Sequence, residues 1–158
     1  QSLNIIGKGP QKMILEEISK SSNKVCKINL LGRLNSKETY EIISKSSLLV
    51  IPSTFDGWAV VVNEALLCGT PVIASSSVGA GVLLGNNIRG DVFEMGDYKK
   101  LKEIVEKRSQ KNINLQESSL IKDWALRNIS PEIAVNYFND ILNYVYSSSK
   151  EKPNAPWL

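Results

Sequence analysis

The sequence predicts a doubly wound (Rossmann-like) α/β fold, with a parallel sheet of about five strands followed by C-terminal helices. Two observations support this prediction. Short apolar runs bounded by Gly or Pro alternate with amphipathic stretches, an order that implies right-handed crossovers between parallel strands. The runs are also mostly continuous rather than alternating with polar residues, as is typical of strands buried on both faces of a sheet.

The strands and helices can be placed along the chain from these runs. Strands are expected at residues 3–6, 25–31, 48–51, 71–74 and 91–93. Helices are expected between them, at residues 10–22, 36–45 and 59–68. Each predicted strand is only a few residues long, which agrees with the usual length of strands in such sheets.

From Asp97 onward the pattern becomes wholly helical. Asp97 is expected to cap one helix, and Ser130 followed by Pro131 predicts the start of another. Apolar stripes are expected at Leu101, Ile104 and Val105, at Leu120, Ile121, Trp124 and Ala125, and at Ala134, Phe138, Ile141, Leu142 and Val145. The predicted domain covers residues 1–147, and residues 148–158 are expected to form a loop-like tail.

Composition narrows the classes of function. The chain has 158 residues, enough for one domain with a core, and a net charge of +3. Its bases are interspersed with acids, as in DYKKLKEIVEKRSQK, which indicates solvated helix faces rather than a nucleic-acid surface. The chain has no histidine, which excludes His-based triads and His-containing zinc sites within it. No metal site is expected, and no cofactor.

The cysteines and the lengths of the apolar runs indicate where in the cell the protein is located. Cys26 and Cys68 lie in apolar runs, so we expect buried, reduced thiols and hence a cytoplasmic protein. No apolar run approaches the roughly 18 residues of a membrane span, and no signal peptide is recognised. Because the first residue is Gln and leads almost directly into a strand, we expect this chain to be a piece of a longer protein.

The stretch PSTFDGWAVVVNEALLCGTPVIAS, residues 52–75, holds the strongest candidate site. Ligands of doubly wound sheets bind at the carboxyl ends of the strands, where this loop lies. Gly57 permits a sharp turn into a helix whose first N–H groups can bind phosphate. Asp56 and Glu64 flank that helix start, and a carboxylate is a suitable acceptor for the vicinal hydroxyls of a sugar.

A structural interpretation of the same residues remains open. Asp56 could serve only as a helix cap, and Glu64 could be a surface acid that favours the helix dipole. The loops GKGP (7–10) and SSSVGAG (75–81) are weaker signals. The first is typical of a strand-to-helix turn, and the second of a flexible loop.

The run PSTFDGWAVVVNEALLCGTPVIASSSVGA resembles the donor-site signature of the GT-B glycosyltransferases, especially family 4, the glycosyl transferases group 1. That signature is an acid, seven residues, a Glu, an Ala-Leu helix and a Gly-Thr-Pro-Val strand. The resemblance extends through IIGKGP, LLGRL and SSLLVIPS to RGDVFEMGD and ISPEIAVNYF, covering roughly residues 3–146.

The resemblance implies roles for individual residues. Asp56 matches the acid expected near the hydroxyls of the donor sugar, and Glu64 matches the acid expected to hold the ribose hydroxyls. The helix start facing the sugar and diphosphate corresponds to Gly57, Trp58, Ala59, Val60 and Val61. Arg33 and Leu34 match the turn that packs against the nucleobase.

Three departures from the family pattern matter. Asp56 stands where Glu is frequent, which shortens the reach to the sugar by one methylene. Ala59 stands where Gly is frequent, so a methyl group narrows the approach. The family's first strand, with its diphosphate-binding Arg and Lys, and its acceptor-binding N-terminal domain have no counterpart here. In the usual order 3-2-1-4-5-6 that strand is central, so we expect strand 2 to close onto strand 4 or to pair with a neighbouring chain.

These observations predict the donor-binding half of a cytoplasmic, retaining, metal-independent glycosyltransferase of polysaccharide biosynthesis. Its expected partners are a nucleotide-diphosphate sugar and a saccharide or lipid-linked acceptor, the latter through the missing domain. Peripheral membrane association is possible for the whole enzyme, and strand-mediated self-association for this chain, which alone is expected to be inactive. The alternatives are a sugar-nucleotide epimerase of the same fold, or a non-catalytic doubly wound interaction module. The module predicts that changing both acids to Ala alters stability only.

Overall fold

The computed structural model describes residues 2–22, 26–85, 88–110, 114–146 and 151–158. Val25, the first residue of one predicted strand, lies outside these ranges, as do residue 147 of the predicted domain and residues 148–150 of the predicted tail. The chain divides into two compact units, Gln1–Ile42 and Ile43–Leu158, which are described separately below. We call them unit 1 and unit 2.

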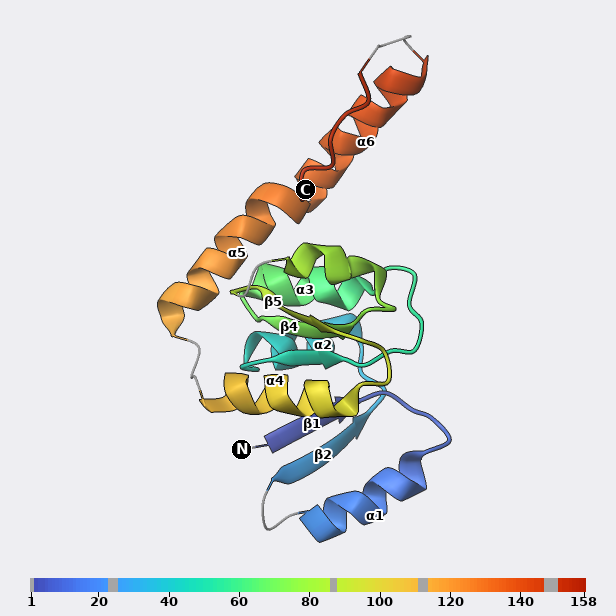
Figure 1. The fold of residues 1–158 in the computed structure, drawn as a ribbon, viewed down its shortest axis with the longest axis vertical. Helices are drawn as coiled ribbons and strands as arrows, with labels where there is room; N and C mark the ends of the chain where they lie inside the picture. The colour runs from blue at the N-terminus through green and yellow to red at the C-terminus, as the bar shows by residue number, and fades with distance from the viewer. Residues whose placement is uncertain (1, 23–25, 86–87, 111–113, 147–150) are drawn as a thin grey trace. The chain divides into compact units, whose positions relative to one another are not determined.

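Unit 1 is a βαβ arrangement (Figure 1). Strand β1 (Ser2–Ile6) and strand β2 (Lys27–Gly32) pair in parallel, and helix α1 (Lys12–Ser22) connects them. The register shifts by one residue between Ile5 and Ile6. Helix α1 contacts β2 but buries none of its residues fully. Helix α2 (Ser36–Ser44) then carries the chain into unit 2.

Unit 2 contains a parallel sheet of three strands in the order β3-β4-β5. The strands are Leu49–Ile51, Val72–Ser75 and Gly90–Phe93, and the central strand β4 is buried along its whole length. Helix α3 (Val60–Cys68) follows β3, and a 3₁₀ helix η1 (Gly79–Leu84) follows β4. The loops that leave the carboxyl ends of β3 and β4, residues 52–59 and 76–78, lead into α3 and η1.

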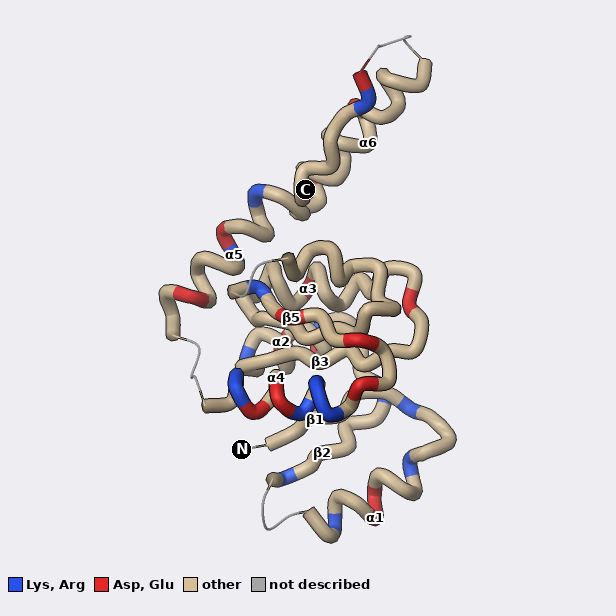
Figure 2. Tube along the Cα trace, viewed as in Figure 1, with Lys and Arg blue, Asp and Glu red and all other residues tan. Residues whose placement is uncertain are grey.

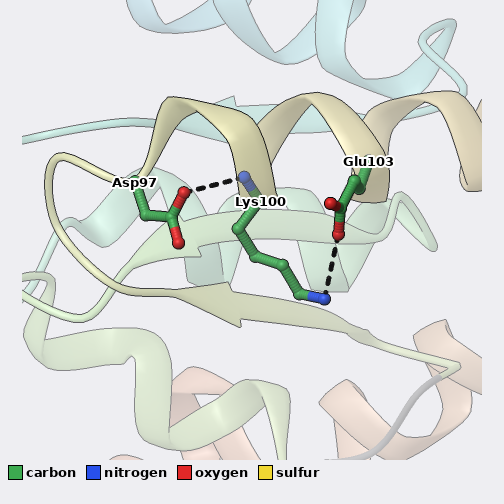
Figure 3. A network of polar contacts seen from close by, with 3 residues as sticks. All are labelled: Asp97, Lys100 and Glu103. Atoms are coloured by element: carbon green, nitrogen blue, oxygen red, sulfur yellow. Dashed lines mark hydrogen bonds and ion pairs between the residues drawn. The ribbon is translucent and has the colours of Figure 1, made fainter.

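Three helices complete unit 2: α4 (Tyr98–Gln110), α5 (Leu115–Ile129) and α6 (Pro131–Tyr146). The two predicted helix starts are confirmed. The Asp97 carboxylate accepts a hydrogen bond from the Lys100 N–H at 2.9 Å, and the Lys100 ammonium pairs with Glu103 (Figure 3). The Ser130 hydroxyl accepts from the Ile133 N–H at 3.4 Å.

The core of unit 2 lies between α3, β4 and α5. Val62, Ala65 and Leu66 of α3 and Ala125 of α5 have no exposed surface. The close contact of the two helices depends on Gly69, whose φ of 80° ends α3 in a left-handed turn. A side chain at Gly69 would overlap Ser118 of α5, so glycine is needed there for both conformation and space.

Several expectations need correction. The five strands are confirmed, but they form two sheets rather than one. Among the described residues β1 pairs with β2 in unit 1 and β3 pairs with β4 in unit 2. The closure of strand 2 onto strand 4, or its pairing with a neighbouring chain, stays a prediction. The loop 75–81 is not flexible throughout, because its last residues begin η1. Within the described residues Cys26 and Cys68 are not joined by a disulfide, but both are partly exposed rather than buried as expected.

The expected apolar stripes differ in burial. In α5, Ile121 is 1% exposed, whereas in α6 Phe138 is 59% exposed and no residue is fully buried. The face of α6 that the sequence predicts to be apolar is therefore largely solvent-accessible in this structure. No helix among the described residues is long and apolar enough to cross a membrane.

Candidate functional site

The loop between β3 and α3 holds Asp56 in a defined position. One oxygen of its carboxylate accepts a hydrogen bond from the Trp58 N–H at 3.1 Å. Asp56 does not cap α3, because the N-cap residue is Ala59. The interpretation of Asp56 as a helix cap is therefore wrong, although its carboxylate does stabilise the turn before the helix. The side chain remains partly exposed.

Ala59 has a left-handed backbone, with φ 65° and ψ 74°. Among the described non-glycine residues it is the one with a positive φ. A residue with a Cβ pays roughly 1–2 kcal/mol for this conformation, which glycine adopts freely. The geometry explains why a glycine would suit this position. Ala59 as a whole is buried, with 7% of its surface exposed.

The start of α3 has no polar side chain that caps it. The Val62 N–H bonds to the Ala59 carbonyl at 2.9 Å, so the N–H groups before it in the first turn have no intrahelical partner. Val60 is 64% exposed, which places this turn at the surface. These amides, together with the positive end of the helix dipole, form a potential anion-binding position.

Glu64 lies in the second turn of α3 and is partly buried. It is the one acid of an otherwise uncharged helix, and Figure 2 shows α3 almost free of charge, in contrast to α4 with its many charged residues. Most other residues of α3 are apolar, so Glu64 does not belong to a polar helix face of the kind that is simply solvated. The structure thus brings Asp56, Glu64 and the amides of Val60 and Val61 onto one loop–helix element.

A second segment that sequence reasoning missed holds this loop in place. The Asp56 N–H donates to the Ser77 carbonyl at 3.1 Å, and the Gly79 and Ala80 N–H groups donate to the carbonyls of Asp56 and Trp58 at 3.0 and 2.9 Å. A side chain at Gly79 would overlap the carbonyl oxygen of Gly57. The motif SSSVGAG therefore frames the loop through its backbone, and the close approach explains its first glycine.

Trp58 anchors the same loop through its side chain. The indole N–H donates to the Asn63 side-chain oxygen at 2.9 Å, which ties the loop to the second turn of α3. The ring of Trp157 lies 5.9 Å from the ring of Trp58, and Tyr137 of α6 contacts Trp157 edge-on at 5.5 Å. No local sequence pattern predicts the contact with Trp157, since Trp58 and Trp157 are far apart along the chain.

Arg33 and Leu34 belong to unit 1, in the turn after β2. Arg33 is exposed and Leu34 is partly buried. The preceding residue, Gly32, lines a pocket of about 780 Å³ together with Ile5, Ile6 and Leu30 and the loop of residues 7–10. Its aliphatic lining residues are Ile5, Ile6, Leu15, Leu30 and Leu31. Neither Arg33 nor Leu34 lines it. Lys8 and Lys12 are the charged residues that line it.

Comparison with known proteins gives a consistent picture. Residues 1–119 match the family described as glycosyl transferases group 1. An uncharacterized glycosyltransferase of Methanocaldococcus jannaschii is 34% identical over 83 residues, which are 52% of this chain and 24% of that protein. This chain thus spans about a quarter of the length of that curated relative.

Solved structures agree at the level of the fold. Sucrose-phosphate synthase from Thermosynechococcus elongatus superposes with a TM-score of 0.72 at 18% identity, covering 93% of this chain and 39% of that one. The Anabaena protein HepE in complex with UDP-glucose superposes with a TM-score of 0.62 at 20% identity, covering 92% and 40%. At these identities the similarity establishes the fold alone.

Proposed function

The chain belongs to the glycosyl transferases group 1 family, and on this premise we propose that it binds the nucleotide-diphosphate sugar donor of a glycosyltransferase. The start of α3 is the observation that carries this proposal. Its amides lack a side-chain cap, lie at the surface, and are flanked by Asp56 and Glu64 in one element. A diphosphate is the ligand that such a helix start suits best.

In this proposal each residue has a role that fits its chemistry. The amides of Val60 and Val61, with Gly57, Trp58 and Ala59 shaping the turn, bind the diphosphate. The two catalytic-site carboxylates are Asp56, which accepts from the hydroxyls of the donor sugar, and Glu64, which accepts from the ribose hydroxyls. HepE, of the same fold, has been crystallised with UDP-glucose, which supports a donor of this class.

For unit 1, taken by itself, we propose that the turn of Arg33 and Leu34 packs against a nucleobase. Arg33 and Leu34 follow Gly32, and Gly32 lines the aliphatic pocket of unit 1. Planar bases bind to apolar walls with a few polar groups to orient them, which is the character of that pocket. No metal takes part in the proposed binding, since backbone amides supply the positive potential.

The activity proposed for the whole protein is retaining transfer of the sugar to a saccharide or lipid-linked acceptor, as in polysaccharide biosynthesis in the cytoplasm. Catalysis would rest on positioning the donor and stabilising the departing diphosphate. Acceptor binding, and any peripheral contact with a membrane, would come from parts of the protein outside this chain. The chain alone is therefore expected to show no transfer; turnover by the purified chain would contradict this division of labour.

Calorimetric titration with UDP, GDP and ADP tests the donor site. We expect one of the three to bind, and Glu64→Ala to weaken its binding at least tenfold, because a charge-assisted hydrogen bond contributes roughly 1.5–3 kcal/mol. The matched control is Glu106→Ala, which removes an exposed acid of α4 and should leave the affinity unchanged. Equal affinities of wild type and Glu64→Ala would contradict the proposed role and would favour a non-catalytic module.

We also propose that the chain self-associates through its strand edges. Among the described strands, β1 and β3 each have one hydrogen-bonded neighbour. An open edge is a template for pairing with another chain. Analytical ultracentrifugation over a range of concentrations should show reversible dimers, and a monomer at every concentration would contradict this.

A further inference from the structure

The C-terminal segment carries an inference that goes beyond the proposed donor site. Residues 151–158 were expected to be a loop-like tail, yet Trp157 is packed against the core of unit 2. In Figure 1 the end of the chain lies beside the beginning of α6. The Trp157 ring contacts both Tyr137 of α6 and Trp58. The segment is thus attached to the loop that holds Asp56.

Trp58 is held by contacts from different parts of unit 2. Its backbone N–H donates to Asp56, its carbonyl accepts from Ala80, and its indole N–H donates to Asn63. The hydrogen bonds fix the backbone and the edge of the indole. The ring of Trp157, tilted by 59° at a centroid distance of 5.9 Å, contacts the aromatic system itself. Aromatic pairs at this separation and tilt attract one another beyond the area they bury.

The conformation of Trp58 determines that of the candidate site on both sides of it. Asp56 receives the Trp58 N–H, so a displaced Trp58 frees the carboxylate to rotate. Ala59 follows directly and has a backbone conformation that L residues rarely adopt. Such a conformation persists only where its surroundings fix it. Loss of the aromatic contact would therefore loosen both the carboxylate and the first turn of α3.

We propose that Trp157 is a positioning residue of the donor site: through Trp58 it holds the Asp56 carboxylate and the first-turn amides of α3 in the arrangement that binds the diphosphate. The inference rests on the proposed function. It places Trp157 outside direct contact with the donor, so the residue acts on affinity through the order of the loop.

The test compares Trp157→Ala and Trp157→Leu with wild type in the full chain. Hydrogen exchange of the hydrogen-bonded amides of Asp56, Trp58 and Val62 should become faster in both variants, while that of α5 stays the same. One of UDP, GDP and ADP is expected to bind to wild type. Its affinity should fall by up to about tenfold in both variants, which is the effect of losing one aromatic contact. Trp157→Leu keeps apolar bulk and guards against a variant that does not fold.

Two controls separate positioning from general stability. Trp157→Phe keeps an aromatic ring and should restore most of the affinity. Trp124→Phe changes another tryptophan that packs against the same core, one whose ring contacts Arg89 instead of the loop, and it should leave the affinity unchanged.

The outcomes distinguish this inference from the proposed function. Wild-type affinity in Trp157→Ala and Trp157→Leu, with or without a lower melting temperature, would overturn the inference and leave the donor site standing. Equal losses in the Trp124 control would also overturn it, because they would indicate a general loss of stability. If wild type binds none of the three nucleotides, the proposed function fails, and the inference fails with it.

Discussion

Helix α3 begins in a different way from helices α2, α4, α5 and α6. Those four have polar side chains at their starts. In α2 the side chains of Asn35 and Glu38 each accept an N–H of the other residue, and in α5 Asn114 accepts from the Glu117 N–H at 2.7 Å. Asp97 and Ser130 act in the same way for α4 and α6. At α3 the corresponding position is Ala59.

The difference is informative because a cap contributes roughly 0.5–2 kcal/mol to stability. The chain forgoes that contribution at α3 and adds a strained backbone there. It compensates with a hydrogen bond from the loop to the Ser77 carbonyl and with hydrogen bonds from the Gly79 and Ala80 N–H groups, which hold the loop by its backbone. The first-turn N–H groups of α3 are therefore available to a ligand, because the backbone hydrogen bonds hold the loop and no side chain caps the helix. At the starts of α2, α4, α5 and α6 a side chain already accepts one of these N–H groups.

The largest expected effect comes from the support behind the loop. Gly79→Ala places a methyl group against the carbonyl carbon and oxygen of Gly57. Both of these atoms belong to the backbone, which cannot move aside as a flexible side chain would. We expect a loss of about 3 kcal/mol in the free energy of unfolding, the upper range for overpacking. Urea denaturation measures it. Gly81→Ala is the control, since its methyl would make only an ordinary contact with Val92. Equal free energies of unfolding for Gly79→Ala and Gly81→Ala would contradict the claim that the close approach of Gly79 to Gly57 supports the loop.

The next effect concerns the strained residue itself. Ala59→Val puts a β-branched side chain at φ 65° and should lower the free energy of unfolding by about 2 kcal/mol. Ala59→Gly relieves the strain but loses a buried methyl, so it should stay within about 1 kcal/mol of wild type. Thermal unfolding of the pair checks this. A valine variant as stable as the glycine variant would show that the backbone at this position is not left-handed in solution.

A capped helix should lose a smaller amount when its cap is removed. Asn114→Ala should cost about 1 kcal/mol, because the Glu117 N–H loses its acceptor. Gln116→Ala, in the same exposed turn, should have almost no effect on the midpoint of urea unfolding. If Asn114→Ala were equally neutral, capping would not distinguish these helix starts from that of α3.

The smallest effect is a pH dependence at the start of α6. Hydrogen bonds from its own backbone N–H and from Ser130 lower the pKa of the exposed Glu132 below its ordinary 4.5. Because the folded pKa is the lower one, this contribution is present above the unfolded pKa and is lost as pH falls through the folded pKa. Glu132→Gln should therefore reduce the difference in melting temperature between pH 7 and strongly acidic pH. The same difference in melting temperature for Glu132→Gln and wild type would contradict the proposed contribution of Glu132 to stability.

The sequence predicted the local features of this molecule well. Continuous apolar runs located all five strands, and polar caps located the starts of α4 and α6, because both signals depend on neighbouring residues. The motif around Asp56 and Glu64 was likewise visible as a local pattern. We expected the five strands to form a single sheet, but they pair in two sheets. Strand pairing depends on contacts between distant segments, which the apolar runs of the individual strands do not encode.

The features that were missed depend on distant contacts or on uncommon backbone conformations. Ala59 gives no sign of a positive φ, since alanine favours right-handed helices. The 3₁₀ helix at Gly79–Leu84 has glycines that are typical of loops, and its conformation follows from hydrogen bonds to the loop before α3. Trp157 stands in a polar, proline-containing tail, where its packing against Trp58 cannot be inferred from its neighbours.

The most direct test of the central claim is hydrogen exchange at helix starts, measured with UDP, GDP and ADP in turn. The claim is that the uncapped start of α3 is kept open for a diphosphate. It predicts that one nucleotide slows exchange of the Val60 and Val61 amides, while the capped start of α5, at Glu117 and Ser118, is unchanged. If none of the three slows exchange at α3, or if one slows it equally at both starts, the claim is wrong.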